Sequence, residues 1–269
     1  MQNSAPARRP FLKTLLLIAA FTVALAGCSR EEVDDTVPAE ELYERAHSAL
    51  QARAWPQAID RYKQLTTRYP FGRHAEQAQL DMAYAQYKAG SSEEAITTLD
   101  RFIRTYPTHP NVDYAWYLKG LVNYSQTMGF MRRLFPGQVV DRDQTSARQA
   151  FMDFQEMIRR FPESRYVADA RQRMVFLRNV MAEQDVVIGE YYFRRGAYIA
   201  AINRARHVIE NFPQAPANID ALDLMARSYA RLDLTELAAD TRRVLEHNYP
   251  DAELKEDEPG FLGKLWPFD

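Results

Sequence analysis

The chain has 269 residues and a formal net charge of −2, with 46% hydrophobic and 26% charged residues. Its pI near 6.3 argues against a nucleic-acid partner, because phosphate backbones are bound by strongly basic surfaces. Only ten glycines occur, and residues that favour helices are abundant, so the composition predicts an all-α protein with ample apolar material for a core.

The first 27 residues have the order of a secretory signal peptide. Basic residues come first and the uncharged apolar stretch 14–27 follows, which is too short for a comfortable membrane span. The sequence LAGC at 25–28 matches a bacterial lipobox at every position. It predicts removal of residues 1–27 and attachment of lipid, palmitate included, to Cys28, which becomes the first residue of the mature protein.

The predicted anchor makes the mature protein a peripheral one, because two or more acyl chains hold stably at about 0.8 kcal/mol per buried CH₂. Ser29 follows the cysteine, which in such lipoproteins favours the outer membrane. Cys28 is the only cysteine, so no disulfide is expected. Its alternative role is that of a small buried hydrophobic residue. The stretch ARRPFLK at 7–13 also resembles a twin-arginine signal, which leaves two export routes open.

Residues 28–38 are predicted to be a flexible tether between the anchor and the folded part. The stretch SREEVDDTVPAEE, which begins at residue 29, is acidic and offers little that a core could bury. The folded, functional part of the chain is therefore expected to begin near residue 39.

An aromatic residue followed by proline closes a repeated unit five times in residues 39–250, in the sequences RYP, TYP, RFP, NFP and NYP. Twelve positions before each proline stands an alanine, and the apolar positions between them fall on one face of a helix. Proline then ends that helix, because it lacks a backbone N–H. Each unit is therefore predicted to close with an amphipathic helix. The prolines are Pro70, Pro107, Pro162, Pro213 and Pro250, and the alanines are Ala58, Ala95, Ala150, Ala201 and Ala238.

Each closing helix has a predicted partner helix before it, such as LYERAHSALQAR at 42–53 and AQLDMAYAQYKAG at 78–90. Small alanines allow close approach, and a period slightly above 34 residues is typical of tetratricopeptide repeats. The predicted fold is an all-α tetratricopeptide-repeat solenoid of five helix pairs in a right-handed superhelix, with an irregular helical bundle as the alternative. Residues 39–162 are expected to form an N-terminal half (repeats 1–3) and residues 163–250 a C-terminal half (repeats 4–5).

Two units are longer than the others. In the third, the extra residues fall in 125–146, which are rich in glycine, proline and apolar residues and are predicted to form a loop. In the fourth, the stretch from Arg165 to Arg195 has no helix breaker and keeps apolar residues at near-heptad spacing. It predicts one long helix that joins the two halves.

The tail, residues 251–269, is acidic at first and then strongly apolar. Because it is unfavourable to leave many large apolar groups in water, we expect this tail to dock on the solenoid's own groove or on an accessory subunit. A frayed end is the alternative. The apolar residues are Phe261, Leu262, Leu265, Trp266 and Phe268.

No pattern in the sequence predicts catalysis. None of the five histidines stands at metal-ligand spacing with another histidine or with Cys28. Nucleophile-elbow, phosphate-loop and zinc-protease motifs are missing from the sequence. We therefore expect a protein that is not an enzyme, with no metal and no cofactor beyond the covalent lipid, whose concave face holds extended peptides or other proteins.

The repeat region contains the motifs RYPFG at 68–72, PTHPN at 107–111 and GEYYFRRGAYIAAINR at 189–204, among others. These motifs resemble the BamD family of outer-membrane assembly lipoproteins, and the resemblance runs through the whole solenoid. It implies a periplasm-facing subunit of the β-barrel assembly machine on the inner leaflet of the cell outer membrane. Its implied partners are the barrel-forming subunit BamA, accessory Bam lipoproteins and the C-terminal strand signal of unfolded outer-membrane proteins. The alternative is a free-standing repeat lipoprotein that scaffolds cell-wall or pilus proteins.

The resemblance also implies where the partners bind. Precursor peptides are expected at the N-terminal repeats, which makes Arg68, Tyr69, Phe71 and Gly72 candidate contacts. Tyr69 belongs to the repeated aromatic-proline motif, so it is equally explained as a core residue, whereas Phe71 and Gly72 recur in no other unit. Pro56 departs from the family pattern, because some relatives carry a basic residue there, and proline at a first helical position explains it.

BamA is expected at the C-terminal repeats. Arg204, which follows asparagine in the fourth unit, matches the family's arginine there, and Arg195 in the sequence FRRG is a second candidate. The rigid fork of an arginine suits a carboxylate across an interface. The alternative for Arg195 is a solvated position on a helix face.

Overall fold

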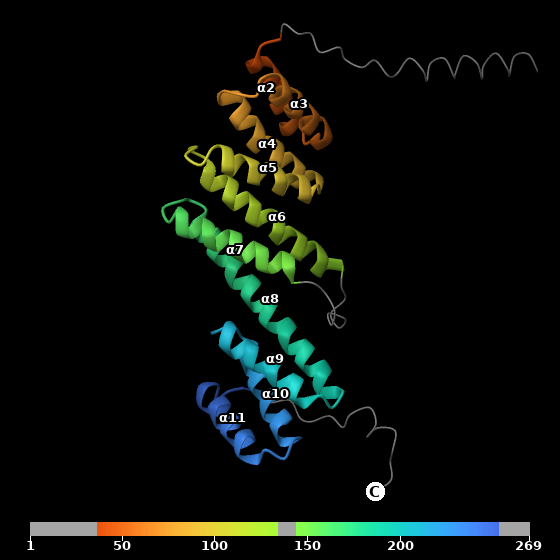
Figure 1. Cartoon of the computed structure of the whole chain (residues 1–269), viewed down its shortest axis with the longest axis vertical. Coiled ribbons are helices and arrows are strands. Elements are labelled where there is room, and N and C mark those ends of the chain that lie inside the picture. The colour runs from red at the N-terminus through yellow and green to blue at the C-terminus, as the bar shows by residue number, and fades with distance from the viewer. Residues whose placement is uncertain (1–36, 134–143, 253–269) are drawn as a thin grey trace, which may run out of the picture.

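The computed structural model describes residues 37–133 and 144–252, and within these ranges it contains ten α-helices. Figure 1 shows them stacked along one long axis, with α2 at one end and α11 at the other. The signal peptide, Cys28, most of the tether and residues 253–269 of the tail lie outside the described residues. The helices are α2 Ala39–Gln51, α3 Trp55–Arg68, α4 Arg73–Ala89, α5 Ser92–Thr105, α6 Val112–Arg133, α7 Thr145–Arg160, α8 Val167–Arg194, α9 Tyr198–Asn211, α10 Asn218–Ala230 and α11 Thr235–Asn248.

The ten helices form the five predicted pairs. Each helix packs against the next one along the chain, and the first helices of neighbouring pairs also meet, as α2 does with α4 and α8 with α10. Contacts between elements close in sequence, repeated along one axis, are the mark of a solenoid. The predicted all-α tetratricopeptide-repeat fold is therefore confirmed.

All five closing helices end where the aromatic-proline motif predicts. The aromatic residue before each proline is the C-cap, with φ between −120° and −138° and ψ between 57° and 79°. The residue before a proline is sterically driven out of the helical region, which explains the same ending in five different sequences. The alanines are buried too, four of them at 0% exposure and Ala238 at 4%.

The turn inside a pair repeats a left-handed residue. Gly90 and Gly196 have φ of 83° and 73°, and in the first and fifth units the equivalent places hold Arg53 and Asp233, with φ of 58° and 59°. In each case the next residue donates its N–H to a carbonyl five positions back, as Ser91 does to Gln86 at 2.9 Å. The turn geometry is thus common to these units, although only two of them use glycine, the residue that adopts it without strain.

The predicted long helix is confirmed as α8, which has 28 residues. Its first half buries Val167, Ala170, Leu177 and Met181, which are among the apolar residues at near-heptad spacing. In the second half of α8 the buried positions are shifted by one residue relative to that spacing. They include the acidic residue Asp185, which is 1% exposed. The buried residues of α7 to α10 form one continuous cluster. The division into halves at residue 162 stays a prediction.

The predicted loop over residues 125–146 is wrong for much of its length. Helix α6 continues to Arg133, and α7 begins at Thr145. One glycine inside a helix costs only about 1 kcal/mol, so Gly129 does not end α6. The first proline of the segment is Pro136, and residues 134–143 lie outside the described part of the chain.

Lys119 links the second and third units electrostatically. Its Nζ lies 2.8 Å from Asp100 on α5 and 3.5 Å from Asp153 on α7. Asp153 is 3% exposed and also accepts hydrogen bonds from Asn123 and Gln149. Burial raises the pKa of Asp153 even though these partners oppose the shift. Lys119 therefore compensates a carboxylate that the core would otherwise disfavour.

Candidate functional site

The turn between α3 and α4 is built by its glycine. Gly72 has φ of 97° and ψ of 168°, a region essentially restricted to glycine. Its carbonyl accepts the N–H groups of Ala75 at 3.0 Å and Glu76 at 3.1 Å, which starts α4. Pro70 constrains the other side of the turn. Together these two residues fix the backbone on either side of Phe71.

The structure separates the residues predicted to contact precursor peptides. Tyr69 is partly buried against the core of the first unit, and its hydroxyl donates to the Val37 carbonyl at 3.0 Å. Arg68 stacks on Tyr69, with its guanidinium carbon 5.7 Å from the ring centre. Phe71 is 86% exposed. Tyr69 is thus explained by packing, and Phe71 is the member of the set presented to solvent.

Helices α2, α3 and α4 meet at Asp81, a residue on α4 that the sequence analysis did not single out. The carboxylate accepts the hydroxyl of Tyr43 from α2 at 2.8 Å and that of Tyr62 from α3 at 3.2 Å. Burial is the main cause that raises the pKa of both tyrosines, and the nearby Asp81 carboxylate raises it further. His47 stacks on Tyr43, with ring centres 5.7 Å apart. The cluster joins the first two units through side chains of α2, α3 and α4.

A second surface is organised around Asp185 on α8. Its two carboxylate oxygens lie 3.0 Å from Arg204 Nη1 and 3.0 Å from His207 Nδ1, both on α9. The carboxylate is 1% exposed, whereas the Arg204 side chain is 41% exposed. A Cβ on Gly189 would come within 2.6 Å of Leu224 Cδ2 and 3.3 Å of Arg204 Cβ, so a larger residue there would displace the Leu224 side chain. The buried carboxylate of Asp185 therefore binds the guanidinium of Arg204, while much of the Arg204 side chain faces solvent.

Arg195 occupies a different setting from Arg204. It is the C-cap of α8, it is exposed, and its guanidinium carbon lies 5.0 Å from the centre of the Tyr191 ring. The contact is a cation–π interaction on the last turns of α8. The Asp185 group thus includes Arg204 but not Arg195 among its hydrogen-bonded members.

A buried ion group lies beneath this surface and was also missed from the sequence. Arg227 on α10 donates to Asp223 at 2.8 Å and to Glu190 on α8, and it lies 4.8 Å from the Phe193 ring centre. A buried cation with two carboxylates and an aromatic face ties α8 to α10. The one available signal was the charged residues within otherwise apolar helix stretches.

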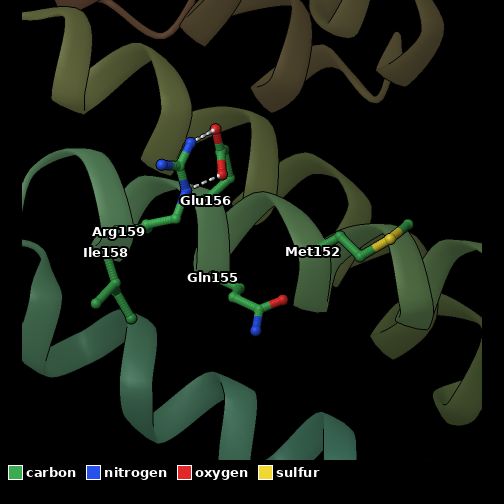
Figure 2. Close-up of a pocket in the computed structure, with 5 residues that line it drawn as sticks. All are labelled: Met152, Gln155, Glu156, Ile158 and Arg159. Atoms are coloured by element: carbon green, nitrogen blue, oxygen red, sulfur yellow. Dashed lines mark hydrogen bonds and ion pairs between the residues drawn. The ribbon is translucent and has the colours of Figure 1, made fainter.

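The outer face of α7 carries a shallow hollow (Figure 2). Figure 2 shows Glu156 paired with Arg159, whose Nε and Nη2 donate at 2.7 and 2.6 Å. These bonds, with that from Arg160, lower the pKa of Glu156 to about 2. Met152 on the same face is 51% exposed. The hollow is formed by residues of a single helix whose charges already neutralise one another.

In the group around Asp185, Arg204 and His207 are paired with one buried carboxylate, whereas Arg68 at the turn before α4 is stacked on Tyr69. Across residues 37–133 and 144–252, no three His, Cys, Asp or Glu side chains are grouped so that they could hold a metal ion. In the same ranges, none of the helices has the length and apolar character needed to span a bilayer.

Comparisons with known proteins identify relatives of this chain. The sequence model of the family YfiO, described as an outer membrane lipoprotein, matches residues 35–245. The chain is 39% identical to an outer membrane protein assembly factor BamD of Xylella fastidiosa over 94% of its own length and 85% of the relative's. It is also 39% identical to one of Neisseria meningitidis, covering 96% and 97% of the two chains. Among solved structures, the TPR2AB domain complex of yeast Sti1 gives a TM-score of 0.42 at 15% identity, over 80% of this chain and 78% of that one.

Proposed function

Because the chain belongs to the BamD family of outer-membrane protein assembly factors, we propose that it binds BamA and unfolded barrel precursors as a subunit of the β-barrel assembly machine. The observation that carries the BamA contact is the Asp185 group, which holds Arg204 in one orientation while 41% of its side chain stays exposed. An arginine whose rotamer is already fixed loses little entropy when it binds a partner's carboxylate.

The proposed precursor contact is the turn that carries Phe71. An unfolded barrel strand has unpaired backbone groups and alternating aromatic side chains, and it aggregates until it is paired. An exposed aromatic on a rigid turn can hold such a strand reversibly by side-chain contact. The exposure of Phe71 and the special backbone of Gly72 support this assignment.

We further propose that the protein is a lipoprotein without catalytic activity. Lipid on Cys28 would hold it on the periplasmic side of the outer membrane, with accessory Bam lipoproteins as neighbours. The lipobox at residues 25–28 supports the anchor. Fixed charge pairs on a helical-repeat scaffold support a role in binding.

The test is an affinity purification of the full chain from detergent-solubilised membranes, with bound proteins identified by mass spectrometry. We expect BamA to copurify with the wild type and to be lost with Arg204→Glu. Arg206→Glu, an exposed arginine of the same helix, is the matched control and should retain BamA. If the wild type does not capture BamA, the proposal fails and the free-standing scaffold takes its place.

Precursor binding is tested with a photoreactive peptide that carries a C-terminal barrel strand. Phe71→Ala should lower the crosslinking yield, because it removes the exposed ring. Ile199→Ala is the matched control, since Ile199 is 59% exposed on α9, far along the chain from the turn. Equal yields from both variants would contradict the assignment of Phe71.

A further inference from the structure

The last helix ends the solenoid with a polar face. In the first four units, a large apolar residue follows the repeated alanine, and it packs toward the next unit or is buried, as Ile96 and Ile202 are. In α11 this position holds Ala239, which is exposed. Arg243 and Glu246 follow on the same face. The end face of α11 is therefore a cap of the kind that terminal repeats need for solubility, and it offers no seat for a sixth repeat.

A different flank of α11 is apolar. The positions directly before the repeated alanine and six after it are polar in each of the first three units, such as Gln57 and Gln64 in the first. In α11 they hold Leu237 and Val244, which are 45% and 47% exposed. Leu234 lies on the same side and is 42% exposed. This set, Leu234, Leu237 and Val244, is called the α11 flank below.

We propose that the C-terminal tail, residues 253–269, folds back along α11 and covers the α11 flank. The described chain ends at Ala252, directly after α11, so the tail starts beside the surface in question. Nine residues lead from there to Phe261 and span up to about 30 Å, whereas the 14 residues of α11 extend over about 21 Å. The apolar part of the tail can therefore reach any point of the flank.

The tail suits the α11 flank because its end is apolar and because its attachment to α11 keeps it close to that surface. Its first residues are acidic, and its large apolar side chains are gathered at 261–268. A segment joined by so short a linker has an effective concentration of about millimolar at its own helix, so a weak apolar contact suffices. The positions of Leu237 and Val244 are apolar in the unit that adjoins the tail, whereas the equivalent positions are polar in the first three units.

The test places a photoreactive benzoylphenylalanine at Trp266 in the full chain in its membrane. We expect an intramolecular crosslink that maps to α11. The double variant Leu237→Glu, Val244→Glu should lower its yield several-fold, and Val244→Thr, which is close in shape, should lower it less. Ala239→Glu, on the polar end face of the same helix, is the matched control and should leave the yield unchanged.

Three results would overturn the proposal. A crosslinked dimer would assign the flank to a second copy, and a crosslink to another protein or to lipid would assign the tail to that partner. No crosslink to α11 in the wild type would show that the tail does not cover the flank. The outcome is independent of BamA capture, so the proposed function can stand or fall separately.

Discussion

Replacing Asp185 by asparagine tests whether the buried carboxylate holds Arg204. The change keeps the shape of the side chain but removes the charge that accepts from Arg204 and His207 at 3.0 Å each. A hydrogen bond to a charged group contributes about 1.5–3 kcal/mol. Because Arg204 is 41% exposed and can return to water, we expect the free energy of unfolding to fall by only about 1–2 kcal/mol.

The assay has two readouts. Thermal unfolding followed by circular dichroism should show a lower Tm, and the capture of BamA should weaken because Arg204 samples more rotamers. Arg204→Ala and the double variant complete a cycle that isolates the coupling between the two residues. If Asp185→Asn changes neither the Tm nor BamA capture, or if the two substitutions are simply additive, Asp185 does not position Arg204.

Three further changes test the fold. Gly72→Ala should destabilise the protein by about 1–3 kcal/mol in urea unfolding, because its backbone conformation is nearly restricted to glycine; an unchanged midpoint would contradict this. Arg53→Gly should stabilise it by about 0.5–1 kcal/mol in the same assay, because it removes a left-handed arginine; any loss of stability would count against the strain. Lys119→Met should cost about 3 kcal/mol at pH 7. Without Lys119 the already raised pKa of Asp153 rises further, so the carboxyl takes up a proton more readily as the pH falls and the loss should shrink toward acid pH; an equal loss at pH 7 and pH 4 would refute the pairing.

Features controlled by neighbouring residues were predicted from the sequence. The five helix ends follow from a proline acting on the residue before it, and the buried alanines follow from helical periodicity. The length of α8 follows from the absence of breakers between Arg165 and Arg195. The one local prediction that failed, the loop at 125–146, gave Gly129 more weight than its cost of about 1 kcal/mol allows.

The sequence also indicated a binding protein, but it did not distinguish exposed candidate contacts from packed ones. Phe71 and Arg204 were candidates, and the structure puts the first in solvent and the second on a buried carboxylate. Tyr69 was an equally good candidate by motif, yet its hydroxyl binds the Val37 carbonyl, 32 residues away. Sequence spacing cannot separate an exposed aromatic from a packed one when both lie in the same turn.

Only the tertiary structure decided which charges meet. Asp81 gathers tyrosines from α2 and α3, and Asp185 on α8 fixes two residues of α9. These pairs join side chains from different helices, up to 38 positions apart. Helical periodicity states which face a residue occupies but not which residue of another helix stands opposite. That pairing is set by how the units stack, so the repeat pattern determined the scaffold and the stacking determined which side chains surround each candidate contact.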